Sequence, residues 1–97
     1  MTIEKSLVDG KLTLKVNGRL DTNTSPDLLA ALKCDGATSV EFDFADLEYI
    51  SSAGLRVLMT AQRSVMEGNG KVTIARPNEM VRGVLDMTGL SSVFDIV

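Results

Sequence analysis

Two runs of alternating polar and apolar residues flank the pair Asp9-Gly10 near the start of the chain. The first run, 3–7, alternates weakly, and the second, 12–16, places three apolar side chains on one face. Asp-Gly between two such runs is among the strongest short-range signals for a β-hairpin. We therefore expect a hairpin whose second strand ends at Gly18, followed by a polar loop over 19–25.

The leucine-rich segment after this loop predicts a short helix. Ser25-Pro26 has the form of an N-cap followed by proline at the first helical position. Asp35-Gly36 closes the helix. The buried stripe is expected to consist of three leucines: Leu28, Leu29 and Leu32.

The next apolar alternation, Val40 to Phe44, predicts a strand. Its aromatic residues should face the core, and the two carboxylates Glu41 and Asp43 should lie on a solvated face. These carboxylates could imitate an acid–base pair, but nothing in the sequence would raise the pKa of either. A solvated strand face is the simpler interpretation.

The longest helix should open at Ser51-Ser52, run to about Met66 and stop at Gly68-Asn69-Gly70. Its apolar positions roughly follow helical spacing. We expect them all to be core positions, the two methionines filling gaps: Leu55, Leu58, Met59, Val65 and Met66.

The last third of the chain predicts one more strand, one more helix and an edge strand. Val72 and Ile74 mark the strand, and Pro77-Asn78 starts a helix that Gly89 ends. The core side of that helix should be formed by Val81, Val84 and Leu85. Residues 94–97 can add a final short strand.

This order of elements indicates an α/β fold. Strands separated by helices favour parallel pairing through right-handed crossovers, whereas the hairpin is antiparallel. The strands alternate in polarity, so one face of the sheet is expected to be open to solvent. We expect one domain over 1–97, a mixed but mostly parallel sheet with helices mainly on one face.

Composition removes several classes of function. The 97 residues carry a net charge of −3 and contain no His and one Cys, Cys34. Without His, and with a single Cys, the usual general base and the Cys/His metal clusters are missing, so we expect neither a bound metal, nor a cofactor, nor an enzyme. Without a basic field, direct nucleic-acid binding is not expected.

The location of the protein follows from similar reasoning. The segment Met1 to Lys5 has no basic start and no apolar run behind it, which argues against a signal peptide. No stretch approaches the roughly 20 apolar residues of a membrane-spanning helix. A lone Cys34 fits a reducing compartment. We therefore expect a cytoplasmic protein with no membrane contact.

The segment around Ser51-Ser52 carries the chemistry of interest. A serine between the end of a strand and the start of a helix is most often the N-cap of that helix, which adds about 1 kcal/mol to the stability of the protein. The same position also suits a phosphate, because a helix N-terminus presents free N–H groups and a partial positive charge. Gly54 also has two possible explanations. A glycine there would allow the helix to pack closely on a strand, or it would allow a partner to approach the helix closely. The sequence alone leaves both pairs of interpretations open.

Three stretches resemble the anti-sigma factor antagonists of the STAS-domain family. The central one is Ile50-Ser51-Ser52-Ala53-Gly54-Leu55, within the run 46–58, which resembles the family's phosphorylation segment. The segment 18–24 resembles the family's loop after the second strand, and 85–90 its late helix-to-loop turn. The stretches occur in the family's order across nearly the whole chain.

The resemblance implies a binding switch. Unphosphorylated members bind an anti-sigma factor that is a serine kinase and so free a sigma factor. Phosphorylation ends that binding, and a metal-dependent serine phosphatase resets the switch. The phospho-acceptor falls on Ser52, while Ser51 stands where many members carry Asp, and Arg56 where several have Gly. ATP would be used by the kinase and not bound here.

The resemblance also implies a partner-binding surface around Ser52. Asp21 matches an acidic loop residue close to the acceptor, and it is expected to orient the hydroxyl or to contact the kinase. The surface is expected to comprise Asp21, Thr22, Asn23, Ser51, Ala53, Gly54, Leu55 and Arg56.

Two other functions remain open at this point. Similar domains serve as accessory or scaffold modules in other regulatory or transport complexes, with no sigma factor as target and the serine sometimes unused. An enzyme with Ser52 as nucleophile is the weaker alternative, because the sequence offers no activating base beyond carboxylates and lysines.

Overall fold

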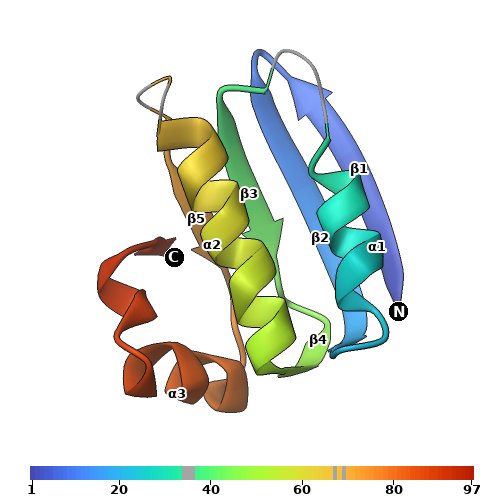
Figure 1. The fold of residues 1–97 in the computed structure, drawn as a ribbon, viewed down its shortest axis with the longest axis vertical. Helices are drawn as coiled ribbons and strands as arrows, with labels where there is room; N and C mark the ends of the chain where they lie inside the picture. The colour runs from blue at the N-terminus through green and yellow to red at the C-terminus, as the bar shows by residue number, and fades with distance from the viewer. Residues whose placement is uncertain (34–36, 67, 69) are drawn as a thin grey trace.

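A computed structural model describes residues 1–33, 37–66, 68 and 70–97. The helices and strands follow the expected order, with one strand added (Figure 1). They are β1 (Thr2–Val8), β2 (Lys11–Leu20), α1 (Ser25–Ala31), β3 (Ser39–Asp43), β4 (Leu47–Ile50), α2 (Ser52–Met66), β5 (Val72–Ala75), α3 (Glu79–Met87), a single 3-10 turn (Leu90–Ser92) and β6 (Asp95–Ile96).

The sheet has the strand order β1-β2-β3-β5-β6, with β4 added beside β2. Of the five strand pairs in the described residues, β1–β2 is antiparallel and the other four are parallel. Helices α1 and α2 lie across one face of this sheet, and α3 lies beyond the end of β5 (Figure 1). The predicted mixed, mostly parallel sheet with helices mainly on one face is confirmed.

The β1–β2 turn forms as the sequence predicts. Asp9 and Gly10 both have left-handed backbones, with φ of 51° and 81°. A two-residue hairpin turn with positive φ at both positions matches the twist of the strands it joins. The pairing Val8↔Lys11 then sets the register of the whole hairpin.

Strand β2 continues beyond the predicted end at Gly18. The register shifts between Gly18 and Arg19, and the strand runs on to Leu20. Its first half pairs with β3, and its last residues pair with β4. The predicted loop start was wrong because glycine here marks a bulge, at φ 106°, and not a strand end.

The core fills the space between the sheet and α1, α2 and α3. It includes the expected inward residues of β2, β3 and β5, and the ring of Phe42 packs beside that of Phe44, which directly follows β3, with centroids 5.7 Å apart. Met59 and Met66 were predicted as core residues and are instead 46% and 58% exposed. The buried stripe of α2 is formed by Gly54, Leu55, Val57, Leu58, Ala61 and Val65. Val57 and Ala61 belong to this stripe, and Met59 and Met66 do not.

Strand β3 holds a second correction, at Asp43. This carboxylate was predicted to be solvated, yet it is buried beside the guanidinium of Arg76 and accepts a hydrogen bond from the N–H of Ala45 (3.1 Å). Burial alone would raise the pKa of Asp43, but these contacts outweigh it and hold the pKa below its usual range. The other carboxylate, Glu41, pairs with Lys11 at 3.1 Å.

The helix starts differ slightly from the prediction. Thr24, not Ser25, is the N-cap residue of α1, and Pro26 lies in the first turn as expected. The N-cap of α3 is Asn78, whose side chain accepts from the N–H of Val81 at 2.8 Å. The predicted closure of α1 at Asp35-Gly36, as well as Cys34, lies outside the described residues.

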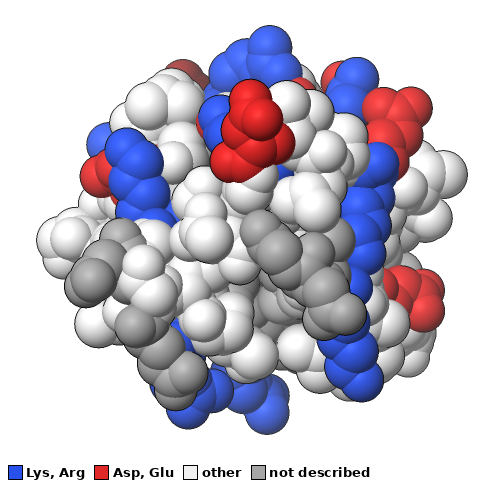
Figure 2. Space-filling model, turned by 90° about the horizontal axis from the view of Figure 1, so that it is seen from above, with Lys and Arg blue, Asp and Glu red and all other residues white. Residues whose placement is uncertain are grey.

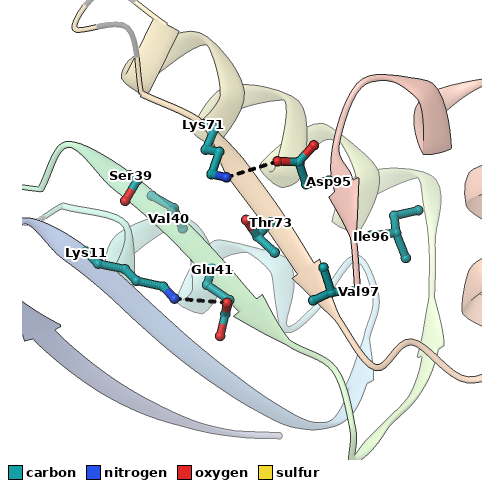
Figure 3. Close-up of a pocket in the computed structure, with 9 residues that line it drawn as sticks. All are labelled: Lys11, Ser39, Val40, Glu41, Lys71, Thr73, Asp95, Ile96 and Val97. Carbon is teal, nitrogen blue, oxygen red and sulfur yellow. Dashed lines mark ion pairs between the residues drawn. The ribbon is translucent and has the colours of Figure 1, made fainter.

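The helix-free face of the sheet has a shallow hollow of about 470 Å³ (Figure 3). Two ion pairs line it, Lys11–Glu41 at 3.1 Å and Lys71–Asp95 at 3.3 Å.

Figure 2 shows the end of the molecule where β1 turns into β2. Basic side chains are spread around this view with acidic ones between them, so the surface in view has mixed charge.

Candidate functional site

Ser51 and Ser52 lie at the junction of β4 and α2, and Ser51 is hydrogen-bonded both to the end of β2 and to the start of α2. The N–H of Ser51 donates to the carbonyl of Leu20 (2.9 Å), which ties the helix start to the end of β2. The hydroxyl of Ser51 accepts a hydrogen bond from the N–H of Gly54 (3.3 Å). This is the geometry of an N-cap, so the capping interpretation holds for Ser51.

Ser52 is the first residue of α2, and its side chain is exposed. The first turn of α2 contains no acidic residue. The partial positive charge of the helix start therefore has no carboxylate of its own helix to balance it. A phosphate on the Ser52 hydroxyl would meet this charge without displacing a core contact.

Gly54 is buried against the end of β2 and against β4. A Cβ at this position would lie 2.8 Å from side-chain carbons of Leu20 and of Ile50. Glycine is thus required by the close packing of helix on strands. Leu55 also faces inward and is 8% exposed. A direct contact of either residue with a partner stays a prediction.

The loop between β2 and α1 is held by Asp21. Its carboxylate accepts hydrogen bonds from the N–H groups of Asn23 (2.9 Å) and Thr24 (3.1 Å). The backbone hydrogen bond from Thr24 is the main cause that lowers the pKa of Asp21. With its carboxylate used this way, Asp21 shapes the loop and leaves Thr22 and Asn23 exposed at its tip.

An apolar groove of about 230 Å³ runs between α1 and α2 beside this loop. Thr22, Ala53 and Arg56, predicted for the partner-binding surface, line it. Sequence reasoning missed its other lining residues: Ser25, Pro26, Leu29, Val57 and Thr60.

Leu29 was the signal that could have revealed the groove. It was predicted to be core and is 41% exposed, whereas the adjacent Leu28 is fully buried. Two neighbouring residues of a helix point about 100° apart. Because α1 meets the core through Leu28, the side chain of Leu29 points to one side of the core and lines the groove.

The site and the hollow on the helix-free face are separate. The two share no lining residue. The charges of the hollow are already paired with one another (Figure 3).

Among the residues that the structure describes, no group of three or more Cys, Asp or Glu side chains could hold a metal ion. No helix in the described ranges is long and apolar enough to span a membrane.

Two relatives match nearly the whole chain. The anti-sigma factor antagonist BtrV of Bordetella bronchiseptica is 30% identical over 99 aligned positions, which cover 99% of this chain and 84% of BtrV. The anti-sigma-B factor antagonist of Staphylococcus epidermidis is 25% identical, over 99% of this chain and 92% of that protein.

The fold has close counterparts among solved structures. SpoIIAA, a Bacillus cell fate determinant, matches in its unphosphorylated form with a TM-score of 0.87, covering 99% of this chain and 88% of SpoIIAA at 18% identity. Its phosphorylated form matches with a TM-score of 0.78 at 17% identity, covering 99% of this chain and 91% of that one. At this identity the likeness shows the fold.

The family assignment rests on the sequence. The model of the STAS domain matches residues 2–97, which is almost the full chain. The chain belongs to the STAS domain family.

Proposed function

We propose that this chain is an anti-sigma factor antagonist whose binding is switched by phosphate on Ser52. In its unphosphorylated form it binds an anti-sigma factor that is a serine kinase, and a sigma factor is thereby freed. The curated relatives named as anti-sigma factor antagonists support this role. Antagonists of this kind are regulatory binding proteins, so the chain is not an enzyme.

One observation carries the choice of Ser52. Of the two adjacent serines, Ser51 is half-buried and caps α2, whereas Ser52 is exposed on the first turn. A kinase needs an accessible hydroxyl, and the fold needs the cap. Phosphate on Ser52 adds about −1.5 to −2 charges at the helix start while the cap and the core stay in place.

The binding surface proposed for the kinase surrounds Ser52. Its exposed and half-buried members come from the β2–α1 loop and the first turns of α2: Asp21, Thr22, Asn23, Ser51, Ala53 and Arg56. Gly54 and Leu55 lie beneath this surface and fix the distance between α2 and the sheet. Phosphate at the centre of such a surface would impose a desolvation cost on a docked partner, and repulsion where that partner is acidic.

The remaining components belong to the partners. The kinase binds ATP, and a metal-dependent serine phosphatase removes the phosphate, so the chain needs no cofactor. The exchange takes place in the cytoplasm. A structure of SpoIIAA in its phosphorylated form supports a fold of this type carrying phosphate.

The direct test is to incubate the chain with the anti-sigma kinase and ATP. Intact mass and peptide mapping should find one phosphate on Ser52, none in Ser52→Ala, and one in the control Ser51→Ala. A tight complex with no phosphate at Ser52 would instead favour an accessory module that uses the same surface without a switch.

A further inference from the structure

Among the residues that the structure describes, Arg56 is the one arginine whose guanidinium has no partner. In the described part of the chain, each of the other arginines has one. Arg19 lies over the ring of Tyr49 at 4.5 Å, Arg63 contacts the Thr60 hydroxyl at 3.5 Å, Arg76 pairs with Asp43, and Arg82 pairs with Asp86 at 3.3 Å. Arg56 is exposed and takes part in none of the ion pairs among the described residues.

The position of Arg56 on α2 gives it access to Ser52. The two residues are four positions apart on one helix, and both are exposed. Residues at this spacing are surface neighbours. Helical side chains also lean toward the N-terminus, so a long side chain at position 56 covers the turn that holds position 52.

Arg56 also lines the groove between α1 and α2. The groove is walled mainly by apolar surface, including Leu29 and Val57, and none of its lining residues is acidic. An apolar groove with one unpaired guanidinium at its edge is complementary to an apolar side chain flanked by a carboxylate. No acidic side chain lines the groove, so a carboxylate that pairs with Arg56 there would belong to another molecule.

We infer that Arg56 has two mutually exclusive partners, a carboxylate of the docked kinase before phosphorylation and the phosphate of Ser52 after it. The inference rests on the proposed function and adds its mechanism. A phosphate on Ser52 carries about −1.5 to −2 charges at pH 7 and lies on the same helix as Arg56, so it competes for the guanidinium more strongly than a singly charged carboxylate of another molecule. Phosphorylation therefore blocks the helix start and withdraws the cation from the groove in one step.

The test uses the full chain in six versions, which are wild type, Arg56→Gln and the control Arg63→Gln, each with serine or with genetically incorporated phosphoserine at position 52. The first readout is the affinity of the serine forms for the anti-sigma kinase. Arg56→Gln should raise the Kd about tenfold, which is the cost of losing one charge-assisted contact. Arg63→Gln is the matched control, because it removes the same charge two turns further along α2, and it should leave the Kd unchanged.

The second readout is the phosphorus NMR titration of the phosphoserine forms, which needs no kinase. Pairing with Arg56 stabilises the dianion, so the second pKa of the phosphate should be lower in wild type than in Arg56→Gln by about half a unit. Arg63→Gln should titrate as wild type does. Equal titration of wild type and Arg56→Gln overturns the proposal.

The two readouts separate the proposal from the function beneath it. If wild type does not bind the kinase at all, the proposed function fails. If wild type binds and Arg56→Gln binds equally well, the function stands and the role given to Arg56 is overturned. Weaker binding together with the shifted titration supports the exchange of partners.

Discussion

The hydroxyl of Ser51 accepts a hydrogen bond from the N–H of Gly54 at 3.3 Å, and this contact separates two serines that are adjacent in sequence. Ser51 becomes part of the helix start, while Ser52 stays exposed on the first turn. The hydroxyl of Ser51 is half-buried and already accepts a hydrogen bond, so it is less accessible to a modifying enzyme than the exposed hydroxyl of Ser52. The fold therefore uses the hydroxyl of Ser51 as the helix cap and leaves the side chain of Ser52 exposed.

The cap predicts opposite effects for the two serines. Ser51→Ala should lower the free energy of unfolding by about 1 kcal/mol, because one N–H at the start of α2 loses its acceptor. Ser52→Ala should leave stability within about 0.5 kcal/mol of wild type, as is usual for exposed positions. Urea unfolding followed by circular dichroism measures both. Equal losses in the two variants would contradict the assignment of the cap.

The packing of Gly54 predicts that alanine is unfavourable there despite its higher helix propensity. The added methyl would lie 2.8 Å from carbons of Leu20 and Ile50, so Gly54→Ala should destabilise the protein by about 1–3 kcal/mol. The matched control is Gly83→Ala in α3, where a Cβ meets nothing within 4 Å. That variant should gain up to about 1 kcal/mol from helix propensity. Thermal unfolding of both proteins gives the comparison, and a stabilised Gly54→Ala would rule out the close contact.

The buried Asp43 predicts a pH-dependent contribution to stability. Its pKa is lowered in the folded protein, so the contribution is present above the unfolded pKa of about 3.9 and is lost as the pH falls through the folded pKa. Asp43→Ala should cost about 2 kcal/mol at pH 7, as expected for hydrogen bonds to a charged group. Urea titrations of wild type and variant from pH 7 to pH 2 should show this difference shrinking in acid. A difference that stays constant with pH would mean that the ionised pair contributes nothing.

The hydrogen bonds of Asp21 predict that its role is to hold the β2–α1 loop. Asp21→Ala removes the acceptor of the Asn23 and Thr24 N–H groups, so hydrogen exchange at these two amides should accelerate. Asp21→Asn keeps an acceptor oxygen and should exchange more slowly than Asp21→Ala. Kinase affinity should follow the same order if the loop forms part of the docking surface. Unchanged exchange in Asp21→Ala would show that the loop holds its shape without this side chain.

Most of the fold could be predicted because its signals are local. The Asp9-Gly10 turn, the period-2 alternation in β2 and β3 and the Asn78 cap each specify their element within a few residues. Strand β4 could not be found this way. Its buried residues, Leu47 and Ile50, are three positions apart, which gives no strand alternation.

Long-range contacts caused the other errors. Asp43 looks solvated until Arg76, 33 residues later in the chain, is brought against it. The exposure of Met59 and Met66 depends on which side of α2 meets the sheet, and the buried Gly54 and Ala61 lie on that side. At the site, the sequence predicted the helix entrance, but the different roles of Ser51 and Ser52 and the groove beside α1 required the assembled fold.

The central claim is that phosphate on Ser52 switches binding to the anti-sigma kinase. Its most direct test is the affinity of that kinase for the unmodified chain and for the chain carrying phosphoserine at position 52, measured by calorimetry with a non-hydrolysable ATP analogue. The unmodified chain should bind, and the phosphorylated chain should bind at least about 100-fold more weakly, a loss of about 2.7 kcal/mol. Equal affinity of the two forms would contradict the switch.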